Sequence, residues 1–190
     1  MKTNFNLLIV FLILIACGKK PESQASSKIE KEEKSFIPVY GQKYFSYDQI
    51  DFYHIDFDEN NILELDKNKD NSKIDKLRND IIIREFPENI KEIGFLKSMD
   101  KIGYIKKEIQ KNKFSEIDKI FIEKTVNESS SYACIPVYRD ILVFKNKGKV
   151  IGIAKICFGC HQHRIIGTKI NDENFGQNGD YEKLKILLNQ

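Results

Sequence analysis

The chain has 190 residues, of which 31 are Lys or Arg and 28 are Asp or Glu, giving a net charge of +3. Arginine occurs at only four positions, Arg78, Arg84, Arg139 and Arg164. This near balance, with so few of the planar guanidinium groups that pair with phosphates and bases, argues against a nucleic-acid partner.

The N-terminal segment predicts a cleaved export signal rather than part of the fold. Lys2 supplies a positive charge, and residues 5–15 are apolar except for Asn6. This run is too short to cross a hydrocarbon core about 30 Å thick, so it fits a secretory signal better than a transmembrane helix. We therefore expect residues 1–16 to be a signal peptide.

The end of this segment points to lipid attachment. It reads Leu14-Ile15-Ala16-Cys17, which resembles the lipobox of bacterial lipoproteins. The resemblance implies a diacylglycerol on the Cys17 thiol and acyl chains such as palmitate. It also implies attachment to a membrane of the bacterial cell envelope, with the outer membrane favoured over the inner. Several chains, at about 0.8 kcal/mol per buried methylene, would anchor the protein without a transmembrane helix.

A polar linker follows the cysteine. Residues 18–34 contain one large apolar side chain, Ile29, among Lys, Glu, Ser and Gln. Such a segment buries too little surface to offset the entropy lost on ordering. We therefore expect residues 17–35 to be the lipidated cysteine and a disordered tether. Residues 36–190 are then long enough for a single domain with its own core.

The first half of this domain predicts strands and then helices. Alternating residues predict a strand near 50–57, and residues 62–65 are expected to begin a partner strand. Ser72 is predicted to cap a helix, and Pro87 to break the chain. Helical spacing returns in two groups of apolar residues, Ile102, Ile105 and Ile109, and then Ile117, Ile120 and Phe121 behind a Ser115 cap.

The second half predicts a β-hairpin and a closing helix. The runs 141–144 and 150–158 are joined by a Gly-containing turn, and residues 164–170 could add a third strand. Asp180 is predicted to cap the last helix, whose apolar face holds Tyr181, Leu184 and Leu188. We expect an α+β fold with a small antiparallel sheet, the hairpin near 140–158 at its centre, and helices on one face.

The hairpin ends in a C-x-x-C-H motif, formed by Cys157, Cys160 and His161, with His163 close behind. One interpretation is covalent haem, since C-x-x-C-H is the c-type attachment pattern. A second is zinc, with Cys134 or His161 completing a set that contains Cys157, Cys160 and His163. A third is a thioredoxin-like redox pair.

The favoured interpretation is a structural disulfide without a cofactor. With Cys17 lipidated, three cysteines remain, and an oxidising envelope favours pairing two of them. The sequence predicts Cys134 bonded to either Cys157 or Cys160, with one thiol left over. Closing such a loop is worth about 3 kcal/mol in the chain-entropy model.

The hairpin segment 138–160 also resembles a pattern found in small exported bacterial proteins of unknown function. That resemblance implies no activity, and it implies that the position of His161 is not always histidine. The sequence contains no Gly-rich phosphate loop, G-x-S-x-G or H-E-x-x-H motif, so no enzyme is predicted. We expect a lipid-anchored binding or accessory module, whose partner beyond the membrane is undefined. The alternative is a haem, metal or thiol-redox protein.

Overall fold

The computed structural model describes residues 37–67, 72–126 and 133–189. The chain divides into two units, Met1–Ser35 and Phe36–Gln190, and every described residue belongs to the second. The expected signal peptide, the lipidated Cys17 and the tether therefore lie outside the described residues. Within the described ranges, no helix has both the length and the apolar composition needed to cross a membrane.

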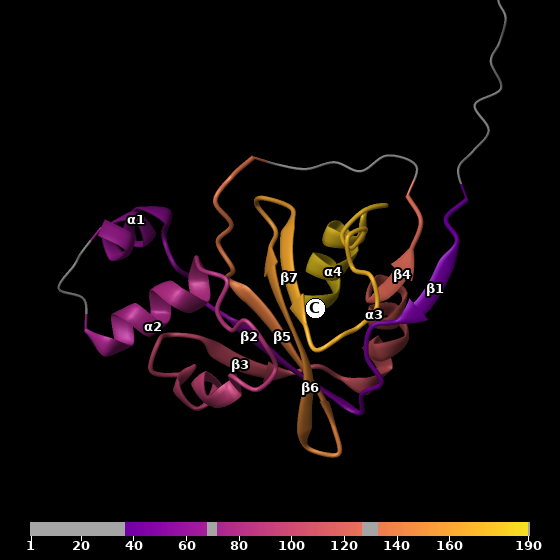
Figure 1. Cartoon of the computed structure of the whole chain (residues 1–190), viewed down its shortest axis with the longest axis horizontal. Helices are drawn as coiled ribbons and strands as arrows, with labels where there is room; N and C mark the ends of the chain where they lie inside the picture. Colours follow the sequence, from indigo (N-terminus) through magenta and orange to yellow (C-terminus); the bar gives the residue numbers. More distant parts are fainter. Residues whose placement is uncertain (1–36, 68–71, 127–132, 190) are drawn as a thin grey trace, which may run out of the picture. The chain divides into compact units, whose positions relative to one another are not determined.

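The main sheet is antiparallel throughout, in the order β3-β2-β5-β6-β7 (Figure 1). Its strands are β2 (Gln49–His54), β3 (Ile105–Glu108), β5 (Asp140–Asn146), β6 (Lys149–Cys157) and β7 (Gln162–Ile166). The predicted hairpin is β5–β6, and β5 is the middle strand. Its turn places Lys147 and Gly148 at φ 48° and 74°, as tight hairpin turns require at both central positions. The α+β class and the central hairpin are confirmed.

Helices cover both faces of this sheet, where helices on one face were expected. One face packs against α1 (Glu59–Lys67), α2 (Lys73–Ile82) and the 3₁₀ helix η1 (Ile93–Ser98). The other packs against α3 (Phe114–Ile120), which follows the short 3₁₀ helix η2 (Lys111–Lys113), and against α4 (Asp180–Asn189). The reason lies in β5, whose four buried residues alternate between the two clusters: Leu142 and Phe144 in one, Ile141 and Val143 in the other.

The secondary structure predicted for two segments of this domain is also wrong. Residues 62–65 belong to α1 rather than to a strand, because the Asp58 side chain accepts a hydrogen bond from the Asn60 N–H and starts a helix there. Ile105 lies in edge strand β3, not in a helix. Ile102 and Ile109 are buried at either end of that strand while Ile105 is 75% exposed, so their helical spacing was fortuitous.

The cap of α2 and the buried face of α4 are confirmed, whereas Asp180 is the first residue of α4 rather than its cap. The Ser72 hydroxyl accepts a hydrogen bond from the Asp75 N–H and caps α2. Residues Tyr181, Leu184 and Leu188 form the buried face of α4. Ser115, in contrast, lies inside α3 rather than at its cap.

A second, two-stranded sheet stands apart from the first. Strand β1 (Tyr40–Lys43) pairs only with β4 (Ile122–Lys124) among the described strands. Strand β4 of this β1–β4 ribbon follows α3 directly in the chain. The Tyr44 N–H continues the ribbon by donating to the Phe121 carbonyl, 3.0 Å away. The Lys43 ammonium also lies 2.7 Å from the Asp118 carboxylate of α3. The ribbon is thereby held beside α3 and α4 (Figure 1).

Aromatic side chains fill the core under α3. The Phe144 ring is fully buried and lies 4.6 Å from the Phe45 ring and 4.9 Å from the Phe121 ring. Opposite Phe144 in the ladder is Gly152, where a Cβ atom would come within 2.1 Å of the Phe45 ring. The missing side chain of Gly152 makes room for Phe45 on the sheet.

Strand β3 forms one edge of the main sheet. All four of its residues are exposed, and Lys106 extends to the fully buried Asp51 carboxylate of β2, 2.8 Å away. Lys145 of β5 approaches the same carboxylate at 2.5 Å. Burial is the largest single influence on the pKa of Asp51 and raises it. The two lysines together outweigh burial, so the pKa of Asp51 is lowered.

Candidate functional site

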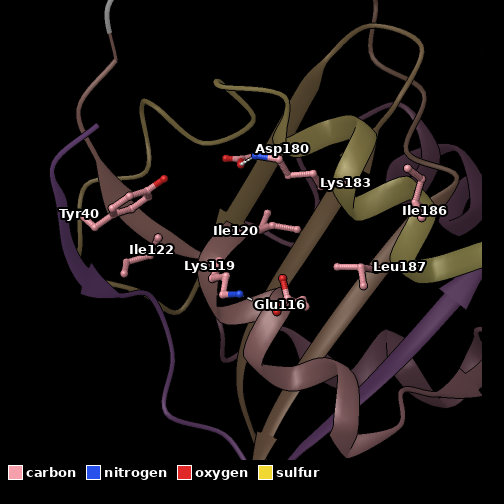
Figure 2. A pocket seen from close by; sticks show the side chains of 9 residues that line it. All are labelled: Tyr40, Glu116, Lys119, Ile120, Ile122, Asp180, Lys183, Ile186 and Leu187. Atoms are coloured by element: carbon pink, nitrogen blue, oxygen red, sulfur yellow. Dashed lines mark hydrogen bonds and ion pairs between the residues drawn. The ribbon is translucent and has the colours of Figure 1, made fainter. Parts of the chain in front are cut away.

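The clearest cavity lies between the β1–β4 ribbon and α4 (Figure 2), with a volume of about 610 Å³. Tyr40 and Ile122 of the ribbon form one wall, and Ile186 and Leu187 of α4 form the other. Ile120, at the end of α3, lies between them. Tyr40 and Ile186 are more than half exposed, so the pocket opens to solvent at its rim. Its lining is largely apolar.

A buried ion pair joins the two walls. Lys124, the last residue of β4, pairs with Asp180, the first residue of α4, and both side chains are almost completely inaccessible. The Lys124 ammonium also donates to the Ile120 carbonyl at 3.2 Å. Burial raises the pKa of the Asp180 carboxyl, and the contact with Lys124 opposes this. The pair holds the start of α4 against the end of β4.

The rim of the pocket carries exposed charges. The Lys119 ammonium lies 2.6 Å from the Glu116 carboxylate, one turn earlier in α3. The Lys183 ammonium donates to the Asn178 carbonyl at 3.1 Å. With the internal pair Lys124–Asp180, three lysines and two carboxylates surround the cavity, a net charge of one positive unit. Exposed pairs of this kind are worth at most about 1 kcal/mol, so a ligand can displace them.

The structure separates the residues of the C-x-x-C motif. Cys160 forms a disulfide with Cys134, with Cα atoms 6.1 Å apart. Cys157, the last residue of β6, is a buried free thiol whose sulfur accepts a hydrogen bond from the Val137 N–H at 3.2 Å. Of the two pairings that the sequence left open for Cys134, the structure therefore has the one with Cys160. A metal or a covalent haem at this motif would require the Cys160 sulfur to leave that bond.

Both histidines contact α4 through Tyr181: His161 lies in the turn between β6 and β7, and His163 lies in β7. The His161 ring stacks on the Tyr181 ring at 4.9 Å, with its backbone at φ 47°. The His163 Nδ1 lies 3.1 Å from the Tyr181 hydroxyl, and its ring packs on Phe175. Burial lowers the pKa of His163. Within the described ranges, no three or more metal-ligating side chains gather in one place.

Removing the disulfide should destabilise the domain measurably. Replacing Cys134 and Cys160 together by serine should lower the free energy of unfolding by about 3 kcal/mol, because a long loop of the unfolded chain is no longer closed. Urea denaturation followed by circular dichroism measures this difference. A reducing agent should produce the same change in the parent and none in the double variant. A change below about 1 kcal/mol would contradict the expected contribution of loop closure.

A second buried group, Lys155 of β6, lies outside the pocket. Its ammonium donates to the Arg84 and Phe86 carbonyls, both at 2.7 Å, and lies 4.5 Å from the centre of the Tyr138 ring. Burial lowers the pKa of Lys155 to about 7. At 1% exposure the group is inaccessible to a ligand, and its role is to hold the segment after α2 against the sheet.

Lys155 predicts a specific dependence of stability on pH. In the unfolded chain this lysine has its ordinary pKa, so between about pH 7 and 10 the unfolded state binds the extra proton and stability rises with pH. Relative to Lys155→Met, the parent should gain up to about 1.4 kcal/mol per pH unit in that window. Urea denaturation at pH 6, 7, 8 and 9 tests this. A difference that stays constant from pH 6 to 9 would refute the lowered pKa.

The sequence missed the pocket entirely. Its residues come from three separate stretches of the chain, and none belongs to a recognisable motif. The available signal was Ile186, which is apolar but falls outside the buried face of α4 formed by Tyr181, Leu184 and Leu188. An apolar residue on the outer side of a helix suggests a further contact.

Comparison with protein-family models, with curated protein sequences and with solved structures finds no match to this chain.

Proposed function

We propose that the chain is a lipid-anchored protein of the bacterial cell envelope that binds a ligand in the pocket between the β1–β4 ribbon and α4. The observation that carries the location is the sequence Leu14-Ile15-Ala16-Cys17 behind a short apolar run. The outer membrane is the favoured site of attachment. The polar residues 18–34 would then link the anchor to β1.

The pocket supports binding rather than turnover. Its volume of about 610 Å³ falls within the range of small-molecule sites, about 300–1,000 Å³. Its lining combines apolar side chains with lysine and carboxylate groups and includes no histidine, cysteine or serine among the described residues. Such a lining offers an apolar surface and charges for recognising a ligand.

The anchor is tested by Cys17→Ala. We expect the parent to be processed, to incorporate labelled palmitate and to sediment with membranes. The variant should remain a full-length precursor without label, because the acceptor thiol is missing. Gel mobility and metabolic labelling in a bacterial host measure both properties.

The matched control is Cys157→Ala, which removes a different thiol and should be processed and labelled as the parent is. Normal processing and membrane retention of Cys17→Ala would overturn the lipid anchor. Retention of palmitate by that variant would place the lipid elsewhere in the chain and would equally overturn it.

A further inference from the structure

We propose that the pocket binds a long-chain fatty acid, with its alkyl chain between the ribbon and α4 and its carboxylate at the rim facing Lys119 and Lys183. The inference rests on the proposed function in taking this pocket as the binding site, and the proposed anchor explains how the ligand would be supplied. It specifies the class of ligand and the side chains that recognise each end of it.

The apolar part of the pocket suits an alkyl chain. Tyr40 and Ile122 face Ile186 and Leu187 across the cavity, with Ile120 between them (Figure 2). An alkyl chain placed there would remove from water both its own surface and the exposed apolar surface of Tyr40 and Ile186. Burial of this kind depends on area rather than direction, so a flexible chain needs no precise partner along its length.

The polar part of the site suits one negative charge. Lys124 neutralises Asp180 inside the molecule, so this carboxylate does not repel an anion in the pocket. Lys183 lies 4.0 Å from the same carboxylate, and Lys119 pairs with Glu116, so the three lysines outnumber the two carboxylates by one positive charge. A ligand carboxylate near Lys119 and Lys183 would bring the site to neutrality while its head group remains hydrated at the rim.

The position of the pocket suits a ligand supplied by a membrane. The ribbon that forms one wall begins at Tyr40, about 20 residues after Cys17. A chain of that length spans at most about 80 Å even when fully extended. A lipid on Cys17 would therefore keep this pocket near the bilayer, where long-chain fatty acids partition.

Photolabelling of the full-length chain tests the proposal. Isolated membranes containing the protein would be incubated with a diazirine analogue of palmitic acid, irradiated and digested for mass spectrometry. Isolated membranes avoid new acylation of Cys17. We expect crosslinks concentrated in peptides that contain Tyr40, Ile122 or Ile186. Labelling spread evenly over the described surface would overturn the proposal.

Two exposed isoleucines provide a matched pair of variants. Ile186 lines the pocket and is 58% exposed, whereas Ile105 lies on edge strand β3 and is 75% exposed. Ile186→Glu should reduce labelling about tenfold by placing a charge in the path of the alkyl chain. Ile105→Glu should leave labelling unchanged. Equal labelling of the two variants would overturn the proposal, since both substitutions add the same charge at an exposed position.

The head group is tested with the corresponding diazirine alcohol. The parent should label more strongly with the acid than with the alcohol, and the double variant Lys119→Gln/Lys183→Gln should lose this preference. Lys149→Gln, at an exposed lysine at the start of β6, should retain it. Equal labelling of the parent by acid and alcohol would refute the role of the carboxylate. Labelling by a photoreactive phospholipid alone would refute a free fatty acid as the ligand.

The inference and the proposed function can fail separately. If Cys17→Ala remains membrane-bound but the pocket is labelled in the parent, the anchor is wrong and the ligand stands. If palmitate is attached to Cys17 but Ile186→Glu has no effect on labelling, the anchor stands and the ligand is wrong.

Discussion

Asp180→Asn should lower the free energy of unfolding by about 3 to 5 kcal/mol, the usual cost of leaving one buried charge without its partner. The Lys124 ammonium would remain in an almost inaccessible site. The Ile120 carbonyl would still accept a hydrogen bond from it, but no negative charge would balance it. The substitution nearly preserves the shape of the side chain, so lost packing contributes little. Urea denaturation followed by circular dichroism at neutral pH measures the difference.

The double variant Lys124→Met/Asp180→Leu separates the charge from the packing. Replacing both partners by apolar groups of similar size is often neutral or stabilising, because it removes the desolvation cost of two ions. We therefore expect it to recover most of the stability that Asp180→Asn loses. If the double variant is less stable than Asp180→Asn, the pair contributes through geometry that apolar side chains cannot replace, and the electrostatic explanation fails.

Phe144→Ala should destabilise the domain by about 3 to 5 kcal/mol. The ring is fully buried on the central strand, between the rings of Phe45 and Phe121. Phe45 and Phe121 belong to different segments of the chain, so the two rings cannot both move in to fill the space. A cavity would therefore remain where the Phe144 ring had been. The loss would be measured as a shift of the urea midpoint at unchanged slope.

Phe158→Ala is the matched control for this loss. Phe158 packs against the same cluster but is only partly buried, so its removal leaves less unfilled space and should cost less than half as much. Equal effects of the two substitutions would show that Phe144 is not at the centre of the core.

The sequence predicted those elements whose signals are local. The β5–β6 hairpin followed from two apolar runs around a turn that contains Lys147 and Gly148, and α2 followed from Ser72 with Asp75. Helix α1 was wrongly predicted as a strand, because the apolar residues in its sequence ENNILELDK fit the repeat of a strand as well as that of a helix. The start signal from Asp58 was interpreted as the end of the preceding strand instead.

The pocket could not be predicted, because it depends on the pairing of distant segments. Tyr40 lies opposite Lys124 in the ribbon, and neither β1 nor β4 contains a turn or a pattern that selects the other. The disulfide shows the same limit at smaller scale. The sequence left Cys134 with two partners, and the choice follows from the length of β6: Cys157 is still within the ladder, opposite Gln162, whereas Cys160 lies beyond it.

Edge strand β3 affects whether two copies of the chain can pair through their main sheets. An unpaired strand edge is a template for another chain, and natural proteins protect such edges with charged side chains, especially lysine. The consecutive lysines Lys106 and Lys107 lie on this edge, so two copies meeting there would bring like charges together. Copies held on one bilayer by the proposed lipid anchor would meet at high local concentration, and the lysines of β3 would then disfavour growth of the sheet from one molecule into the next.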